Sequence, residues 1–176
     1  MNIENNLINS ELENKRIESL KASQLPDNFR DQLETFNDKR LDEVTINIVP
    51  DSLWTKGEQP TESEAERQLI SVKQSYFELM KSNEEIAWFI HELAHCQKFL
   101  DLKSPEDYEK GMRTFAFTDL KSDYSYPNNQ VEQYAFSKQF AYLKEQGKNQ
   151  EEILNMLRKY YGEEDLVFFK RLLEKL

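Results

Sequence analysis

The sequence predicts an α+β fold that is mostly helical, with a small sheet ahead of a long central helix and a helical C-terminal half. Three observations support this. The 176 residues include only four Gly and five Pro, few for an all-β chain rich in tight turns. Aromatic residues make up 12% of the chain, enough to supply one packed core in a chain of one-domain length. The spacing of apolar residues changes from helical to alternating and back again.

The first forty residues are polar and carry apolar side chains at helical spacing. These are Ile3, Leu7, Ile8, Leu12, Ile17 and Leu20, followed after Pro26 by Phe29, Leu33 and Phe36. Such a one-sided pattern predicts amphipathic helix. We therefore expect a helical N-terminal arm or subdomain over residues 1–40 and a main domain over residues 41–176.

The period changes to two at residues 44–49, which alternate and are rich in β-branched side chains. Pro50 follows, so a strand is predicted over 43–49. Residues 51–66 contain Gly57, Pro60 and many polar groups, which favour a surface loop. A second short strand is predicted at 69–72, Leu-Ile-Ser-Val.

Helical patterns occupy most of the remaining chain. Ser82 and Glu85 have the spacing of a capping box, in which each side chain bonds the other residue's backbone N–H. Ser104 before Pro105 and Asn129 are further helix-start signals. The predicted helices cover 74–81, 83–100, a segment from 105, 129–146, 149–161 and 163–175, whereas 114–127 has no clear assignment.

Charge and composition exclude several classes of function. Lys and Arg number 23 against 33 Asp and Glu, a formal net charge of −10, and no dense basic run is present, so nucleic acid is not an expected partner. No apolar stretch approaches the roughly 18 residues of a membrane span. The single cysteine and the absence of a signal-like N-terminus predict a cytoplasmic protein. The excess of acidic residues is explained by solubility or, alternatively, by a preference for basic or unfolded peptide partners.

The two histidines of the chain flank a glutamate in His91-Glu92-Leu93-Ala94-His95. Side chains four residues apart on a helix share one face, so both imidazoles can reach one metal ion. The apolar residues of this helix fall on the other side of the helical wheel, which predicts that the histidines face a cleft (Ile86, Phe89, Ile90, Leu93 and Leu100). Glu92 lies beside the metal, where it can accept a proton from an activated water.

A carboxylate must complete a three-residue metal site, because no third histidine exists. Glu132, at the start of the helix predicted from 129, is the preferred ligand. It could instead form a capping pair with Asn129. Asp119 and Asp123 are the reserve candidates. Glu84 and Glu85 are better explained by capping and the helix dipole.

His91-Glu92-Leu93-Ala94-His95 followed by Glu132-x-x-Ala135-Phe136 resembles the gluzincin class of zinc metallopeptidases, including small intracellular peptidases of bacteria and mobile elements. The resemblance covers roughly residues 68–146. It implies a zincin-like domain that hydrolyses peptide bonds of a protein or peptide substrate, with Zn²⁺ held by His91, His95 and Glu132. It also implies that Glu92 is the general base. This chain has Phe136 where family members often carry an Asp that orients a histidine.

An oxyanion donor must be Tyr or Arg, since both histidines are used. Three tyrosines lie near Glu132 in the sequence, Tyr124, Tyr126 and Tyr134, and Tyr126 is the predicted catalytic one. Arg113 is the nearest isolated cation. For each tyrosine, the alternative is that it only packs against its neighbours. The strand at 69–72 is a candidate edge for pairing with a peptide. Cys96 is expected to pack. The competing functions are a zincin-fold protein-binding module without activity and hydrolysis of a non-peptide amide.

Overall fold

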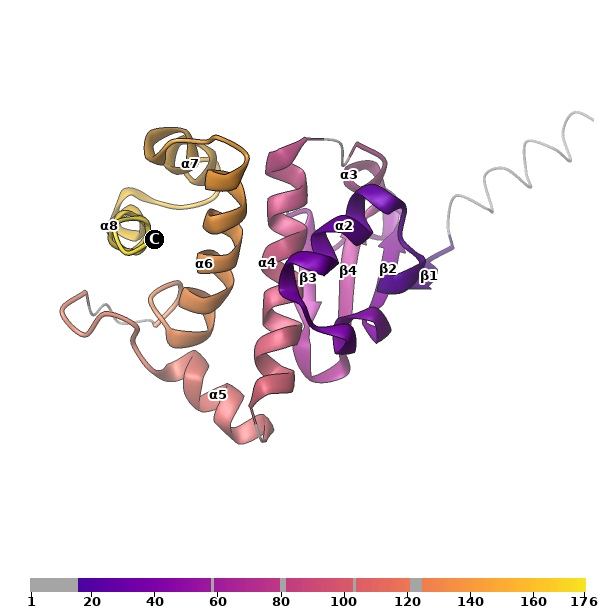
Figure 1. Cartoon of the computed structure of the whole chain (residues 1–176), viewed down its shortest axis with the longest axis horizontal. Coiled ribbons are helices and arrows are strands. Elements are labelled where there is room, and N and C mark those ends of the chain that lie inside the picture. The colour runs from indigo at the N-terminus through magenta and orange to yellow at the C-terminus, as the bar shows by residue number, and fades with distance from the viewer. Residues whose placement is uncertain (1–15, 58, 80–81, 103, 121–124) are drawn as a thin grey trace, which may run out of the picture.

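The computed structural model describes residues 16–57, 59–79, 82–102, 104–120 and 125–176. It combines helices with one small mixed sheet, so the predicted α+β class is confirmed (Figure 1). The sheet, with α2 (Asp27–Phe36) beside it, forms one half of the molecule, and the C-terminal helices form the other.

The sheet has four strands in the order β1-β2-β4-β3. They are β1 (Glu18–Lys21), β2 (Thr45–Val49), β3 (Thr61–Glu64) and β4 (Leu69–Lys73). The central pair β2 and β4 is parallel, and each edge strand is antiparallel to its neighbour. The predictions of strands at 43–49 and 69–72 are confirmed. Ile46, Ile70 and Val72 are fully buried and alternate with partly exposed polar residues, so one face of the sheet packs on the core.

Two predictions for the N-terminal half are wrong in part. The predicted loop over 51–66 contains β3, whose Thr-Glu-Ser-Glu sequence has no apolar alternation and is ordered by pairing with β4. The helix predicted within residues 2–40 is present at α2. Residues Glu18–Lys21 instead form the strand β1, because pairing with β2 outweighs their helical spacing. Residues 1–15 lie outside the described residues, so a division at residue 40 stays a prediction. Ala22, Leu25 and Phe29 join the same core as the rest of the chain.

The central helix is α4 (Asn83–Asp101), preceded by the short α3 (Gln74–Leu79). The predicted capping box is present, with Ser82 accepting from the backbone N–H of Glu85 and Glu85 accepting from that of Ser82. Residues 86–97 are all buried, because α4 lies between the sheet and α6 (Gln130–Glu145) (Figure 1). The histidine face contacts this second helix and also lines a cavity, as the prediction that it faces a cleft requires.

The remaining helices are α5 (Pro105–Arg113), α7 (Gln150–Leu157) and α8 (Glu163–Leu173). Ser104, Asn129 and Asn149 cap α5, α6 and α7 through their side-chain oxygens. Aromatic rings join α6 to α8, with Phe136 and Phe169 at a centroid distance of 4.7 Å. The helix predicted over 149–161 ends at Leu157, and the turn that follows carries Tyr160 and Tyr161 to the functional site.

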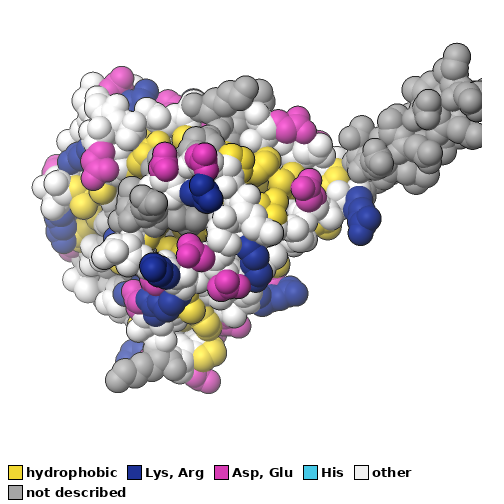
Figure 2. Space-filling model, turned by 45° about the vertical axis from the view of Figure 1, so that its right-hand side comes forward, with side chains coloured by type: hydrophobic (Ala, Val, Ile, Leu, Met, Phe, Trp, Pro, Cys, Tyr) yellow, Lys and Arg dark blue, Asp and Glu magenta, His cyan; other side chains and the backbone are white. Residues whose placement is uncertain are grey.

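Acidic and basic side chains are interspersed on the face of the molecule shown in Figure 2. Within the described part of the chain, no helix has the length and apolar character needed to cross a membrane.

Candidate metal centre

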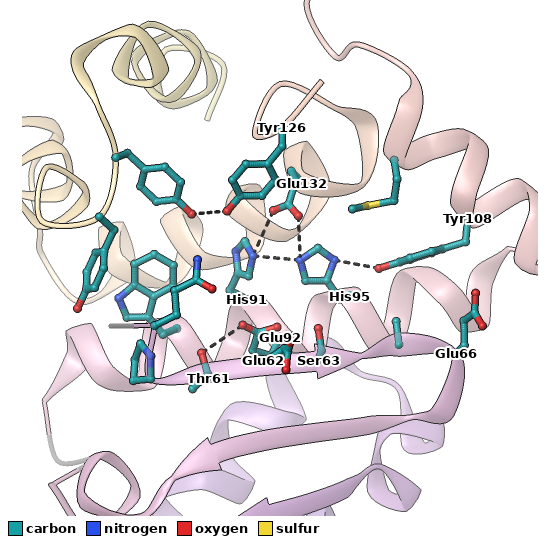
Figure 3. A pocket seen from close by; sticks show the side chains of 17 residues that line it. Thr61, Glu62, Ser63, Glu66, His91, Glu92, His95, Tyr108, Tyr126 and Glu132 are labelled. Carbon is teal, nitrogen blue, oxygen red and sulfur yellow. Dashed lines mark hydrogen bonds and ion pairs between the residues drawn. The ribbon is translucent and has the colours of Figure 1, made fainter. Parts of the chain in front are cut away.

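Three side chains from two helices converge on one point (Figure 3). His91 and His95 lie one turn apart on α4, and their Nε2 atoms are 3.0 Å from each other. Glu132 approaches from α6, with Oε2 at 3.3 Å from Nε2 of His91 and Oε1 at 3.5 Å from Nε2 of His95. All three residues are buried, at 5%, 6% and 5% exposure respectively. The predicted ligands are thus brought together by the packing of α4 on α6.

The N-cap of α6 does not compete with this use of Glu132. The Asn129 side chain accepts from the backbone N–H groups of both Val131 and Glu132, and the Glu132 side chain contacts the two histidines. Asn129 alone therefore caps the helix, and the Glu132 carboxylate is directed into the site.

The spacing of these atoms fits a metal ion. Ligands at about 2.0–2.1 Å around a tetrahedral ion lie roughly 3.3 Å from one another, which matches the observed 3.0–3.5 Å. Two imidazole lone pairs 3.0 Å apart repel unless a cation or a proton lies between them. Oε2 of Glu132 is also buried with no hydrogen-bond partner among the described residues. A buried His-His-Glu cluster that could hold a metal ion is therefore present.

The surroundings of Glu132 and His95 favour the charged form of each side chain. Burial raises the pKa of Glu132, but the charge of His95 and the close contacts of the carboxylate with both imidazoles outweigh it and hold that pKa well below its ordinary value. Burial lowers the pKa of His95, and the charge of Glu132 reverses the shift, so the pKa of His95 is raised. Glu132 is therefore an ionised carboxylate, the form that binds metals.

The two histidines are oriented in different ways. Nδ1 of His95 lies 3.1 Å from the Tyr108 hydroxyl, so with Nε2 facing the cluster its Nδ1–H donates to that oxygen. The His91 ring instead packs on Phe136, at a centroid distance of 4.4 Å, and on Trp88 at 5.9 Å. Its Nδ1 is buried without a hydrogen-bond partner among the described residues. Phe136 thus supplies packing to His91 and no hydrogen bond to its ring.

Glu92 is buried beside the cluster and lines the same cavity. Its Oε1 accepts a hydrogen bond of 3.1 Å from the hydroxyl of Thr61 on β3 (Figure 3). The carboxylate is therefore held at a fixed place between α4 and the edge strand.

The cavity has a volume of about 340 Å³ and is bounded by β3, α4, α5 and the segments before α6 and after α7. Tyr126 lines it, and its hydroxyl lies 2.7 Å from that of Tyr161. Trp88 and Tyr160 form part of the aromatic wall, with ring centroids 5.1 Å apart.

Other predicted candidates lie away from the cavity lining. Asp119 pairs with Arg171, Arg113 with Glu109, and the Tyr134 hydroxyl donates to Gln97. Glu84 pairs with Lys148 and Lys159, and Glu85 closes the capping box. Cys96 is buried, and burial raises the pKa of its thiol to about 12, which suits a packing residue. Asp123 and Tyr124 lie outside the described residues.

Thr61 and Tyr108 are the site residues that sequence analysis missed. Thr61 falls in the segment predicted as a loop, and Tyr108 lies in a short helix with no metal-site motif. Each contacts a motif residue only through the tertiary fold, and local sequence carries no signal of that contact. Comparisons with protein-family models, with curated protein sequences and with solved structures found no match for this chain.

Proposed function

We propose that this protein is a zinc-dependent metallopeptidase of the gluzincin type. The observation that carries the proposal is the convergence of His91, His95 and Glu132 on one point, with the Glu92 carboxylate in the same cavity. Two imidazoles and one carboxylate are a donor set typical of catalytic zinc sites. Zinc bound there polarises a substrate carbonyl and lowers the pKa of a water molecule.

Glu92 is the proposed general base. Thr61 occupies Oε1 of the carboxylate, which leaves Oε2 to accept a proton from the attacking water and to pass it to the leaving amine. A protein that only bound a partner through the metal would have no use for a carboxylate held in this way.

Tyr126 is the proposed oxyanion donor. Although 45% of the residue is exposed, Tyr126 lines the cavity and its hydroxyl contacts that of Tyr161 (Figure 3). Burial of this hydroxyl, and next the charge of Glu132, raise the pKa of Tyr126, so the group keeps its proton at neutral pH. A protonated phenol can donate to a developing oxyanion.

The edge strand β3 offers a place for an extended peptide. It pairs with β4 on one side only and runs along the cavity (Figure 3). A peptide can add to such an edge through main-chain hydrogen bonds. The sequence prediction placed this edge at 69–72 and is wrong, because those residues form β4, which lies between β2 and β3.

Metal content and peptide cleavage test the proposal. We expect about one zinc per chain by elemental analysis, strongly reduced in Glu132→Ala and retained in Glu145→Ala, a variant at the far end of α6. Glu92→Gln should keep its zinc and lose turnover of unfolded casein by at least about 100-fold. The matched control Glu84→Gln changes a carboxylate of α4 outside the cavity and should cleave normally. No zinc uptake by the wild type would contradict the proposal.

A further inference from the structure

The cavity lining is acidic. It contains four glutamates and, among the described residues, no Lys or Arg. Glu132 belongs to the metal cluster and Glu92 is held by Thr61. Glu62 is paired with Lys56, whose Nζ lies 2.8 Å from Oε1. The fourth glutamate of the lining is Glu66.

Glu66 lies on the short 3₁₀ turn Ala65–Arg67 that joins β3 to β4. It is exposed and has no hydrogen-bond or ion-pair partner among the described residues. In Figure 3 its side chain stands at the end of the cavity below Tyr108. Its charge also makes a small contribution to the raised pKa of Tyr108, after the larger effects of burial, Glu132, Cys96 and Glu92.

The wall that α5 contributes to the cavity is apolar and aromatic. Tyr108 and Met112 are four residues apart on α5 and share one face, and both line the cavity. The aliphatic stem of a long basic side chain can lie along such a wall, and its cation is attracted to the face of an aromatic ring. An acidic side chain entering the same space would meet an uncompensated carboxylate.

The cavity keeps a net negative charge when a metal is bound. A dication offsets two of the four carboxylates and Lys56 offsets the charge of Glu62, so the charge of Glu66 remains. The whole chain carries −10, which also attracts cationic partners at long range.

We propose that the Glu66 end of the cavity, with Tyr108 and Met112, is a subsite for the Lys or Arg side chain of a basic peptide. Tyr108 also contacts His95, so the selected residue lies within one or two positions of the scissile bond. This inference rests on the proposed peptidase function and adds to it the chemical class of the substrate.

Peptide binding tests the subsite without cleavage. The full-length Glu92→Gln variant, loaded with zinc, is titrated against three fluorescein-labelled decapeptides that differ only in a central Lys, norleucine or Glu. Fluorescence anisotropy should show the Lys peptide binding about fivefold more tightly than the norleucine peptide, and the Glu peptide most weakly. The preference for Lys should decline as salt is raised.

A second substitution locates the effect. Adding Glu66→Gln should remove most of the preference for Lys while leaving the norleucine peptide unchanged. The matched control is Glu64→Gln, which removes a carboxylate paired with Arg67 that does not line the cavity, and it should keep the preference. Equal binding of the three peptides, no binding of any, or equal effects of both substitutions would overturn the subsite.

Cleavage by the wild type is measured separately with the same peptides. Absence of cleavage counts against the peptidase function, while the anisotropy result still decides the subsite. Cleavage of all three peptides at equal efficiency counts against the subsite and leaves the peptidase function standing.

Discussion

At the scale of single residues, Thr61 links the edge strand to the proposed base. Its hydroxyl is the group that donates to Oε1 of Glu92 in the described structure, and both residues are buried. A carboxylate that loses this donor can rotate away from the position in which it meets the attacking water. Thr61 therefore acts through Glu92 as a positioning residue.

The isosteric change Thr61→Val should lower kcat about 5–20-fold with little change in KM, since one hydrogen bond to a charged group is lost and peptide contacts are kept. Thr61→Ser restores the hydroxyl and should recover most of the rate. Steady-state kinetics on a peptide substrate measure both constants. A rise in KM at constant kcat would instead place Thr61 in substrate binding.

Gln139 is a residue that the site does not use. It lies on α6, is fully buried, and neither its amide nitrogen nor its oxygen has a partner among the described residues. An unpaired buried polar group costs about 1–3 kcal/mol, so Gln139→Leu should raise the free energy of unfolding by about 1–2 kcal/mol. Urea denaturation measures the change.

Gln97 is the matched control for that substitution. It is also a buried glutamine between α4 and α6, but it donates to Asp38 and accepts from the Tyr134 hydroxyl. Gln97→Leu removes the acceptor of the Tyr134 hydroxyl and one of the hydrogen bonds to Asp38, and it should destabilise the fold. Stabilisation by both changes would show that side-chain volume, and not hydrogen bonding, decides the outcome.

At the scale of elements, close packing of α5 on α6 fixes Tyr108 relative to Glu132. A Cβ added at Gly111 would lie 2.9 Å from Cγ2 of the fully buried Val131, closer than carbon atoms normally approach. Gly111→Ala should therefore destabilise the protein by about 1–3 kcal/mol, although alanine is the better helix former by about 1 kcal/mol.

Thermal denaturation of Gly111→Ala beside Lys110→Ala measures this effect. Lys110 is an exposed neighbour on the same helix, and its substitution should be nearly neutral. A stabilised Gly111→Ala would mean that α5 can move away from α6 at no cost.

Helices and edge strands differ in how far sequence predicts them. Ser82, Ser104 and Asn129 mark helix starts through local hydrogen bonds, and the structure has those helices within a residue of the prediction. The strand β1 depends on pairing with β2, which is distant in the chain, and β3 depends on pairing with β4 across a short turn. In both cases the strand's own residues carry little signal. Spacing alone brings His91 and His95 together, whereas Thr61 reaches Glu92 only because of that pairing.

At the scale of the whole molecule, α4 joins two halves. The sheet supplies Thr61 and the edge strand on one side, and the C-terminal helices supply Glu132 and the aromatic wall on the other. Away from the cavity, Asp38 ties the segment between α2 and β2 to α4. It accepts from the backbone N–H and guanidinium of Arg40 and from the amide of Gln97.

This link makes stability depend on pH in acid. Hydrogen bonds from Arg40, opposed by burial, lower the pKa of Asp38 from 3.8 to about 2. The unfolded chain therefore binds this proton first, so the contribution of Asp38 is complete above about pH 5 and is lost as pH falls toward 2. Asp38→Asn keeps the capping oxygen and removes the charge. It should cost roughly 1 kcal/mol at pH 7, a figure that allows for the half-exposed Arg40.

Chemical denaturation of both proteins at a series of pH values measures this dependence. The difference in unfolding free energy between wild type and Asp38→Asn should be constant from pH 7 to about pH 5, shrink as pH falls toward 2, and approach zero only below about pH 2. Both proteins contain the other carboxyl groups, so the titration of those groups cancels in this difference. A difference that stays constant down to pH 2 would mean that the Asp38 carboxylate stabilises the fold through hydrogen-bond geometry that Asn cannot reproduce, and not through its charge.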